Sequence, residues 1–182
     1  MPEHAATAAA DLGWQQLLAT AGELGNALLH RQWMLACAES CTGGLVAAAL
    51  TALPGSSAWF ERALVTYSNA AKCELLGVPQ ALLHRHGAVS EPVALAMAQG
   101  VLEHAPVQAA LAITGIAGPG GGTADKPVGL VWFAWALRGP QGVRAQAQHV
   151  LWPGDRHAVR MAAAQHALRG MLERVLRQAP PR

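Results

Sequence analysis

Hydrophobic positions along the chain follow two alternating patterns, which predict helices and buried strands in turn. Apolar residues recur at roughly helical spacing from about residue 12 to 29, and further helices are predicted over 43–53, 70–76, 79–86, 91–104 and 156–177. Short apolar runs predict strands over 34–38, 63–67, 109–114, 128–137 and 143–152. The segment 138–142 suits an antiparallel hairpin. About five strands interleaved with helices predict an α/β sandwich with a mixed sheet.

Capping residues mark the predicted helix boundaries. Ser68 or Asn69 is expected to cap the helix that follows the second strand, and Gly77 to end it. Ser90 and Asp155 occupy the same capping position before two later helices. These residues divide the chain into short units without an internal repeat or a linker.

Length and composition indicate one globular domain. At 182 residues the chain is long enough for one well-buried domain and barely compatible with two, so we expect residues 1–182 to form a single domain with the Ala-rich residues 1–10 frayed. Because 52% of residues are hydrophobic and only 13% charged, we expect another subunit to cover part of the surface, with a homodimer favoured. The net charge of +2 comes from scattered residues, without the basic run typical of nucleic-acid binders.

The sequence shows no pattern of a targeting or membrane segment. The first residues lack the basic flank of a signal peptide, and no apolar run approaches the roughly 20 residues that cross a bilayer. Cys37, Cys41 and Cys73 form neither a CxxC pair nor a disulfide framework, which fits a reducing interior. We therefore expect a soluble cytoplasmic protein that binds neither nucleic acid nor a membrane.

The stretch from Ala38 to Gly44 is the leading candidate for chemistry, because it turns a predicted buried strand sharply into a helix. A helix start offers unpaired N–H groups and the positive end of the helix dipole, and glycines let a ligand approach the backbone. Such a turn can hold an anion or the oxyanion of an acyl transfer, with Ser40 as the candidate nucleophile. A serine here is also a common helix cap, and the G-x-S-x-G and phosphate-loop patterns are both missing.

A serine nucleophile needs a base, and Lys72 is the strongest candidate. The chain has only two lysines among 13 basic residues, and lysine, unlike arginine, can act as a base once its pKa is lowered. A position in the first turn of a helix pushes the pKa of Lys72 downward. Tyr67, the only tyrosine, is expected at the preceding strand end, facing the same edge of the sheet; the alternative is a core aromatic with its hydroxyl at the surface.

Three further features are open to two interpretations each. Cys41 competes with Ser40 as nucleophile, since a thiol at a helix N-terminus has a depressed pKa, but cysteine is also a common small core residue. The glycine-rich segment 115–122 can embrace a phosphate or consist only of turns. Arg156 is a phosphate clamp or a solvated residue. No spacing of Cys, His, Asp or Glu indicates a metal site, and no cofactor is expected.

Several motifs, in order along the chain, closely resemble the CinA C-terminal domain family. They are Ala38–Gly44, Pro54–Ser57 with Trp59-Phe60, Val65–Asn69 with Lys72, Gly87–Glu91, Thr114–Pro119, Lys126–Gly129 and Gly154–Arg156. The resemblance runs from about Trp14 to the final helix and leaves out the two ends of the chain. Several members of that family are nicotinamide-nucleotide amidohydrolases, so the resemblance implies a hydrolase.

The resemblance implies a three-layer α/β/α fold with a mixed, mostly parallel sheet of about five strands. It also implies hydrolysis of nicotinamide mononucleotide to nicotinate mononucleotide and ammonia, a step of pyridine nucleotide salvage and NAD metabolism. Ser40 matches the nucleophile, and Lys72 with Tyr67 its activating partners. Backbone N–H groups at Thr42, Gly43 and Gly44 are then expected to hold the oxyanion. The candidates for binding the rest of the substrate are Thr114, Gly115, Gly118 and Arg156.

Two other functions compete with this hypothesis. One is a non-catalytic nucleotide-binding or partner-binding module related to competence- and damage-inducible proteins. The other is amide hydrolysis on a different pyridine or nucleotide substrate. Larger members of the family carry an additional N-terminal domain with metal-dependent pyrophosphatase activity, and this chain is too short to include it, so we infer neither that activity nor its metal.

Overall fold

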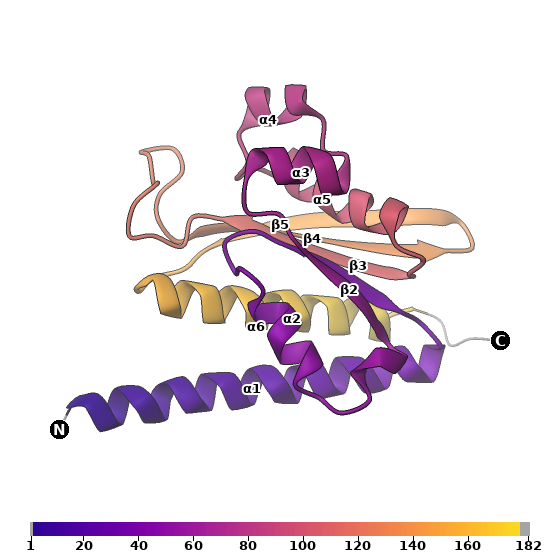
Figure 1. Ribbon diagram of the computed structural model, residues 1–182, viewed down its shortest axis with the longest axis horizontal. Coiled ribbons are helices and arrows are strands. Elements are labelled where there is room, and N and C mark those ends of the chain that lie inside the picture. Colours follow the sequence, from indigo (N-terminus) through magenta and orange to yellow (C-terminus); the bar gives the residue numbers. More distant parts are fainter. Residues whose placement is uncertain (1, 179–182) are drawn as a thin grey trace.

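A five-stranded mixed sheet forms the centre of the protein, whose computed structural model describes residues 2–178 (Figure 1). The three neighbouring strands β2, β1 and β3 run parallel, whereas β4 pairs antiparallel with both β3 and β5. In spatial order the strands are β2 (Phe60–Val65), β1 (Leu35–Glu39), β3 (Ala109–Gly115), β4 (Leu130–Gly139) and β5 (Gly142–Leu151). The predicted mixed sheet with a C-terminal hairpin is confirmed.

Helices cover both faces of the sheet, which confirms the three-layer α/β/α arrangement (Figure 1). One face carries α2 (Leu45–Thr51) and α6 (Arg156–Leu176), with α1 (Pro2–Arg31) packed along them on the side away from the sheet. The opposite face carries α3 (Asn69–Leu76), α4 (Gln80–His86) and α5 (Glu91–His104). A 3₁₀ turn, η1 (Ser56–Ala58), leads into β2. No helix within residues 2–178 is long and apolar enough to cross a membrane.

Side-chain alternation along the central strands produces two different cores. Cys37 of β1 and Leu111 of β3 point toward α2 and α6, where large side chains fill the space. Ala38 and Ala112, one residue further along each strand, point toward α5. The small alanines let α5 approach the sheet closely, and α3 packs against α5. The position of a polar residue at the end of a strand therefore determines which of the two helix layers its side chain faces.

Capping residues lie at the predicted helix boundaries. Ser68 Oγ accepts a hydrogen bond from Ala71 N, and Asp155 caps α6 by accepting one from Ala158 N. Ser90 occupies the predicted N-cap position of α5, but its hydroxyl makes no capping bond. The hydroxyl donates to Gly87 O at 2.8 Å instead and so closes the preceding turn.

Strand boundaries differ most around the second and fourth strands. The second strand was expected over 63–67 and lies at Phe60–Val65, so Tyr67 follows the strand instead of ending it. Helix α1 begins at Pro2, and Met1 and residues 179–182 lie outside the described part of the chain. Two expectations stay predictions: the fraying of residues 1–10 and the organisation of the chain as a single domain.

Candidate active site

Three polar residues lie side by side where the parallel strands end. Ser40 follows β1 directly, and its N–H donates to Ile113 O of β3 at 3.0 Å. Thr66 follows β2, and its N–H donates to Glu39 O of β1 at 2.8 Å. These bonds continue the parallel ladder by one residue, so the row runs from Thr66 through Ser40 to Thr114. Alternation along the strands directs all three side chains toward the layer of α3 and α5.

Lys72 reaches this row from the first turn of α3. Its ammonium group donates to Ser40 Oγ at 3.2 Å and to the carbonyl oxygen of Thr66 at 2.8 Å. The side chain is almost completely buried, with 1% exposure, and loss of solvation lowers the pKa of Lys72 below its usual value of 10.5. A serine hydroxyl therefore lies in direct contact with a lysine that loses its proton more easily than a lysine in water.

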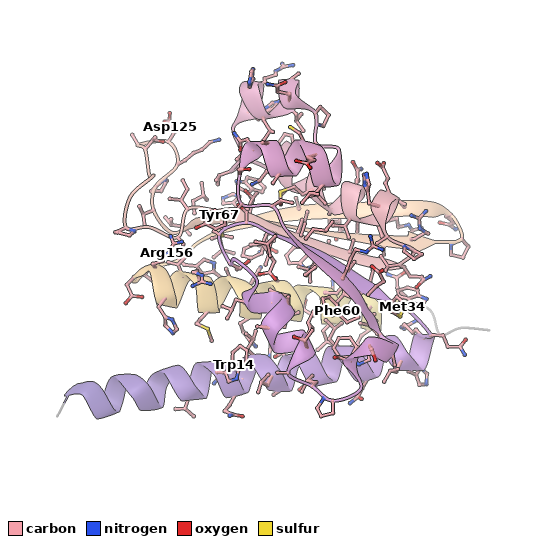
Figure 2. All side chains as sticks on the ribbon, in the orientation of Figure 1. Trp14, Met34, Phe60, Tyr67, Asp125 and Arg156 are labelled. Carbon is pink, nitrogen blue, oxygen red and sulfur yellow. The ribbon has the colours of Figure 1, made fainter. Side chains whose placement is uncertain are left out.

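Tyr67 and Arg156 form a second, more exposed part of the site (Figure 2). Tyr67 is 59% exposed, and its hydroxyl accepts a hydrogen bond from Arg156 Nη2 at 2.6 Å. Arg156 Nη1 also donates to Gly118 O at 2.8 Å, so one guanidinium connects the tyrosine with the glycine-rich loop. Tyr67 is therefore not a core aromatic. Within residues 2–178 no hydrogen bond joins it to Ser40 or Lys72.

The turn after Ser40 uses its backbone donors unequally. Gly43 N donates to Ser40 O at 3.0 Å, and Gly44 N donates to the carboxylate of Glu39 at 3.0 Å. Both glycines have left-handed backbone angles, with φ of 59° and 91°. Among the described residues, no other residue provides an acceptor for the N–H groups of Cys41 and Thr42. Of the three N–H groups expected to bind the oxyanion, only that of Thr42 remains available, because those of Gly43 and Gly44 already donate within the protein. The N–H group of Cys41 becomes a further candidate donor.

Glu39 was missed as a functional candidate, although it organises this turn. Its side chain is completely buried and accepts hydrogen bonds from three N–H groups of the α2 N-terminus: Gly44 (3.0 Å), Val46 (3.2 Å) and Ala47 (2.9 Å). Strand alternation could have indicated this, because Glu39 must point to the face opposite Ser40, where α2 lies.

Cys41 does not fit the role of a second nucleophile. Its side chain is 6% exposed and packs in the core on the α2 and α6 side, together with Cys37. Burial is the main reason that the pKa of Cys41 rises to about 11; the Glu39 charge acts in the same direction, and the backbone N–H of Cys41, Lys72 and Arg160 oppose it. The predicted depression of its pKa by the helix N-terminus was wrong, because desolvation outweighs the helix and Glu39 occupies that terminus.

The glycine-rich loop and α6 position further groups around the site. Thr114 Oγ1 donates to Ala88 O at 2.9 Å and so holds the segment before α5 against the sheet. Gly115 lets β4 approach closely, since a Cβ there would lie 2.8 Å from Leu130 O. Arg160, one helical turn after Arg156 and also missed from the sequence, donates through Nη2 to Thr42 O at 2.7 Å and ties the turn to α6.

A groove of about 540 Å³ lies on the same face of the sheet, toward β4 and β5. Trp132 of β4 pairs with Thr114 on one side and with His149 of β5 on the other, so the groove continues the row of Ser40 and Thr114 across the sheet. Neither Ser40 nor Lys72 lines it. The nucleophile candidate therefore lies on the same face of the sheet but outside this groove. Residues 12–178, whose side chains the structure describes, contain no group of three or more His, Cys, Asp or Glu that could hold a metal ion.

A buried serine–lysine pair on an α/β/α scaffold defines a site with the parts of an amide or ester hydrolase. Residues 18–175 match the CinA C-terminal domain family, and the chain belongs to that family. It is 51% identical over 155 residues to nicotinamide-nucleotide amidohydrolase PncC of Enterobacter agglomerans, covering 85% of this chain and 93% of that one.

Two further relatives support the family assignment. A CinA-like protein of Akkermansia muciniphila is 53% identical over 146 residues, which cover 80% of this chain but only 34% of that longer protein. The crystal structure of the competence/damage-inducible protein CihA from Agrobacterium tumefaciens superposes with a TM-score of 0.84 at 41% identity, covering 89% of this chain and 96% of that one. The fold and the family predicted from the sequence are thereby confirmed.

Proposed function

We propose that this protein hydrolyses the carboxamide of nicotinamide mononucleotide to nicotinate mononucleotide and ammonia, with Ser40 as nucleophile. The observation that carries the proposal is the contact of 3.2 Å between Lys72 Nζ and Ser40 Oγ, made by a lysine that is almost completely buried. The names of the PncC relatives, nicotinamide-nucleotide amidohydrolases that match most of this chain, support the choice of substrate.

Lys72 acts as the general base in this proposal. In its neutral form it takes the proton of Ser40 Oγ while that oxygen attacks the carboxamide carbon. The carbonyl oxygen of Thr66, 2.8 Å from Lys72 Nζ, keeps the amine aimed at the serine. This contact is direct, so the proton needs no relay through Tyr67, and Tyr67 instead contributes to the outer part of the site.

The tetrahedral intermediate requires donors for its oxyanion. The open N–H groups of Cys41 and Thr42 directly follow Ser40, which supports their use as these donors. Lys72, protonated in the first step, returns its proton to the leaving nitrogen, and ammonia departs as the C–N bond breaks. A water molecule, deprotonated by the same lysine, then attacks the acyl-enzyme and releases nicotinate mononucleotide with regeneration of Ser40.

Arg156 and Tyr67 are proposed to bind the part of the substrate beyond the carboxamide. Both are exposed, and Tyr67 directly follows Thr66, whose N–H bonds the residue before Ser40. Arg156 bonds Tyr67 and also contacts the glycine-rich loop through Gly118. A guanidinium there suits the phosphate of a mononucleotide. The action of the protein in the cytoplasm and its assembly as a homodimer remain predictions that rest on composition.

Ammonia release from nicotinamide mononucleotide tests the proposal directly. Wild-type protein should release ammonia in equal amount to nicotinate mononucleotide, and Ser40→Ala should abolish release, while the exposed Ser57→Ala serves as the matched control. Full activity of Ser40→Ala would sink the serine mechanism. Substrate binding by calorimetry without any product would favour the non-catalytic module, and a panel of carboxamides would reveal a different substrate.

A further inference from the structure

The N-terminus of α2 already holds an anion, and that anion is a side chain of the protein. Both carboxylate oxygens of Glu39 are used: Oε2 accepts from Gly44 N at 3.0 Å and Val46 N at 3.2 Å, and Oε1 accepts from Ala47 N at 2.9 Å. Glu39 is completely buried. A buried carboxylate is tolerated only when it is well hydrogen-bonded, and here three backbone donors satisfy it.

This arrangement differs from ordinary helix capping in this protein. At α3 and α6 the residue directly before the helix provides the cap, Ser68 and Asp155, and both caps are at exposed positions. At α2 the N-cap residue is Gly44, which has no side chain, and the carboxylate comes from the last residue of β1. The sequence therefore places the capping charge beneath the turn instead of at its surface.

Glu39 fixes both ends of the turn that contains the nucleophile. Its backbone carbonyl accepts from Thr66 N of the neighbouring segment at 2.8 Å, and its side chain holds Gly44 at the start of α2. Ser40, Cys41, Thr42 and Gly43 lie between these two anchors. Because the donors of the helix terminus are occupied, the N–H groups that remain open to a reacting oxygen are those of Cys41 and Thr42.

We propose that Glu39 is a positioning residue of the serine chemistry. Its carboxylate holds the Cys41 and Thr42 N–H groups in the direction of the oxyanion that forms next to Ser40. The effect is confined to the transition state, since Glu39 is buried beneath the turn and touches no substrate. The inference deepens the proposed amidohydrolase function and rests on it.

Glu39→Gln tests this role with almost no change of shape. The glutamine side chain has one NH₂ group where glutamate has a second acceptor oxygen. In either orientation of the amide, this NH₂ group faces at least one backbone N–H of α2, and because both are donors the turn must shift. We expect kcat for ammonia release to fall at least about tenfold, with KM changed less than about threefold, because oxyanion donors act on the transition state. The variant is measured per folded molecule, with folding followed by circular dichroism.

Thr20→Val provides the matched control for lost stability. Thr20 Oγ1 accepts from Gln165 Nε2 at 2.8 Å between α1 and α6, in the helix layer on the side away from the sheet. This variant should lose stability and keep its kcat. If Glu39→Gln also keeps the wild-type kcat per folded molecule, the positioning role is refuted and Glu39 is only a helix cap.

A sulfonyl fluoride separates this inference from the substrate assignment. Attack of Ser40 Oγ on the sulfur releases fluoride and passes through charged oxygens that need the same donors, and intact mass reports the adduct. Wild type should be labelled at least about tenfold faster than Glu39→Gln. If wild type is labelled faster than Glu39→Gln but releases no ammonia from nicotinamide mononucleotide, only the assignment of this nucleotide as substrate is refuted. Equal labelling rates would overturn the inference, and no labelling together with no ammonia would overturn both.

Discussion

The buried and the exposed groups around Ser40 are built in opposite ways. Glu39 on the α2 face of the sheet and Lys72 on the α3 face are both almost completely buried, and backbone groups hold both at 2.8–3.2 Å. At the surface lie Tyr67, which is 59% exposed, and Arg156, which connects the tyrosine to the glycine-rich loop. We call these the floor and the mouth of the site.

This difference in burial indicates that the floor and the mouth have different roles in catalysis and binding. Groups in the floor are desolvated and fixed before any substrate arrives, which suits proton transfer and stabilisation of charge in the transition state. Groups in the mouth stay in contact with water and can exchange their protein partners for a ligand at small cost. Substitutions in the floor should therefore change kcat, and those in the mouth should change KM.

The largest effect is expected from the base in the floor. Lys72→Met should lower kcat by about 10²–10⁴-fold, since general base catalysis contributes about that much. Lys72→Arg should be similarly inactive although it keeps the positive charge, because a guanidinium cannot give up its proton. Steady-state ammonia release measures both variants. An active Lys72→Arg would show that only the charge is needed and would remove lysine from the role of base.

The next effect concerns the helix that carries Lys72. A Cβ at Gly100 of α5 would lie 2.0 Å from the carbonyl oxygen of Leu76, the last residue of α3, so Gly100→Ala must push the two helices apart. We expect the free energy of unfolding to fall by about 1–3 kcal/mol, and kcat to fall as Lys72 moves away from Ser40.

Gly22→Ala is the matched control for this helix displacement. It also replaces a helical glycine, but its Cβ would meet only Leu53 Cδ1 at 4.0 Å, so its stability should stay equal or rise. Denaturant unfolding measures the free energy of unfolding of Gly100→Ala and Gly22→Ala relative to wild type. An unchanged stability of Gly100→Ala would show that α3 is not held by this contact.

Ser40 and Lys72, but not Glu39, could be predicted as site residues from sequence patterns alone. Ser40 stood out because an apolar run turned into a helix at a pair of glycines, and Lys72 because a rare lysine followed a strand in the first turn of a helix. Both signals are local, and the carboxyl ends of parallel strands meet at one edge of the sheet. The direct contact of the two side chains follows from that topology.

The hydrogen-bond partners in the site could not be predicted in the same way. The sequence predicted unpaired N–H groups at the start of this helix, and in the structure Glu39 accepts from three of them. The partner of Tyr67 is Arg156, 89 residues further along the chain, and Arg160 binds the turn at Thr42 from the same helix. Such pairings depend on how α6 lies against the sheet, which no local pattern contains.

A moderate effect is expected from the mouth. Arg156→Ala should raise KM for nicotinamide mononucleotide about tenfold while kcat changes less than about threefold, because a charge-assisted contact to phosphate is lost in ground state and transition state alike. Nicotinamide riboside, which lacks the phosphate, should show little change in KM. If kcat falls and KM does not, Arg156 belongs to the catalytic floor and the division of the site is wrong.

The smallest effect is a dependence of stability on pH that originates in the floor. Because burial lowers the pKa of Lys72 below 10.5 in the folded protein, the unfolded chain binds more protons than the folded one between the two values. The free energy of unfolding contributed by Lys72 must then rise as pH increases through the lowered pKa. Denaturant unfolding of wild type and Lys72→Met at pH 7 and pH 10 isolates this contribution, since all other titrating groups are shared. The stability of wild type relative to Lys72→Met should increase with pH, and a constant or falling difference would show that the lysine is not desolvated in the folded state.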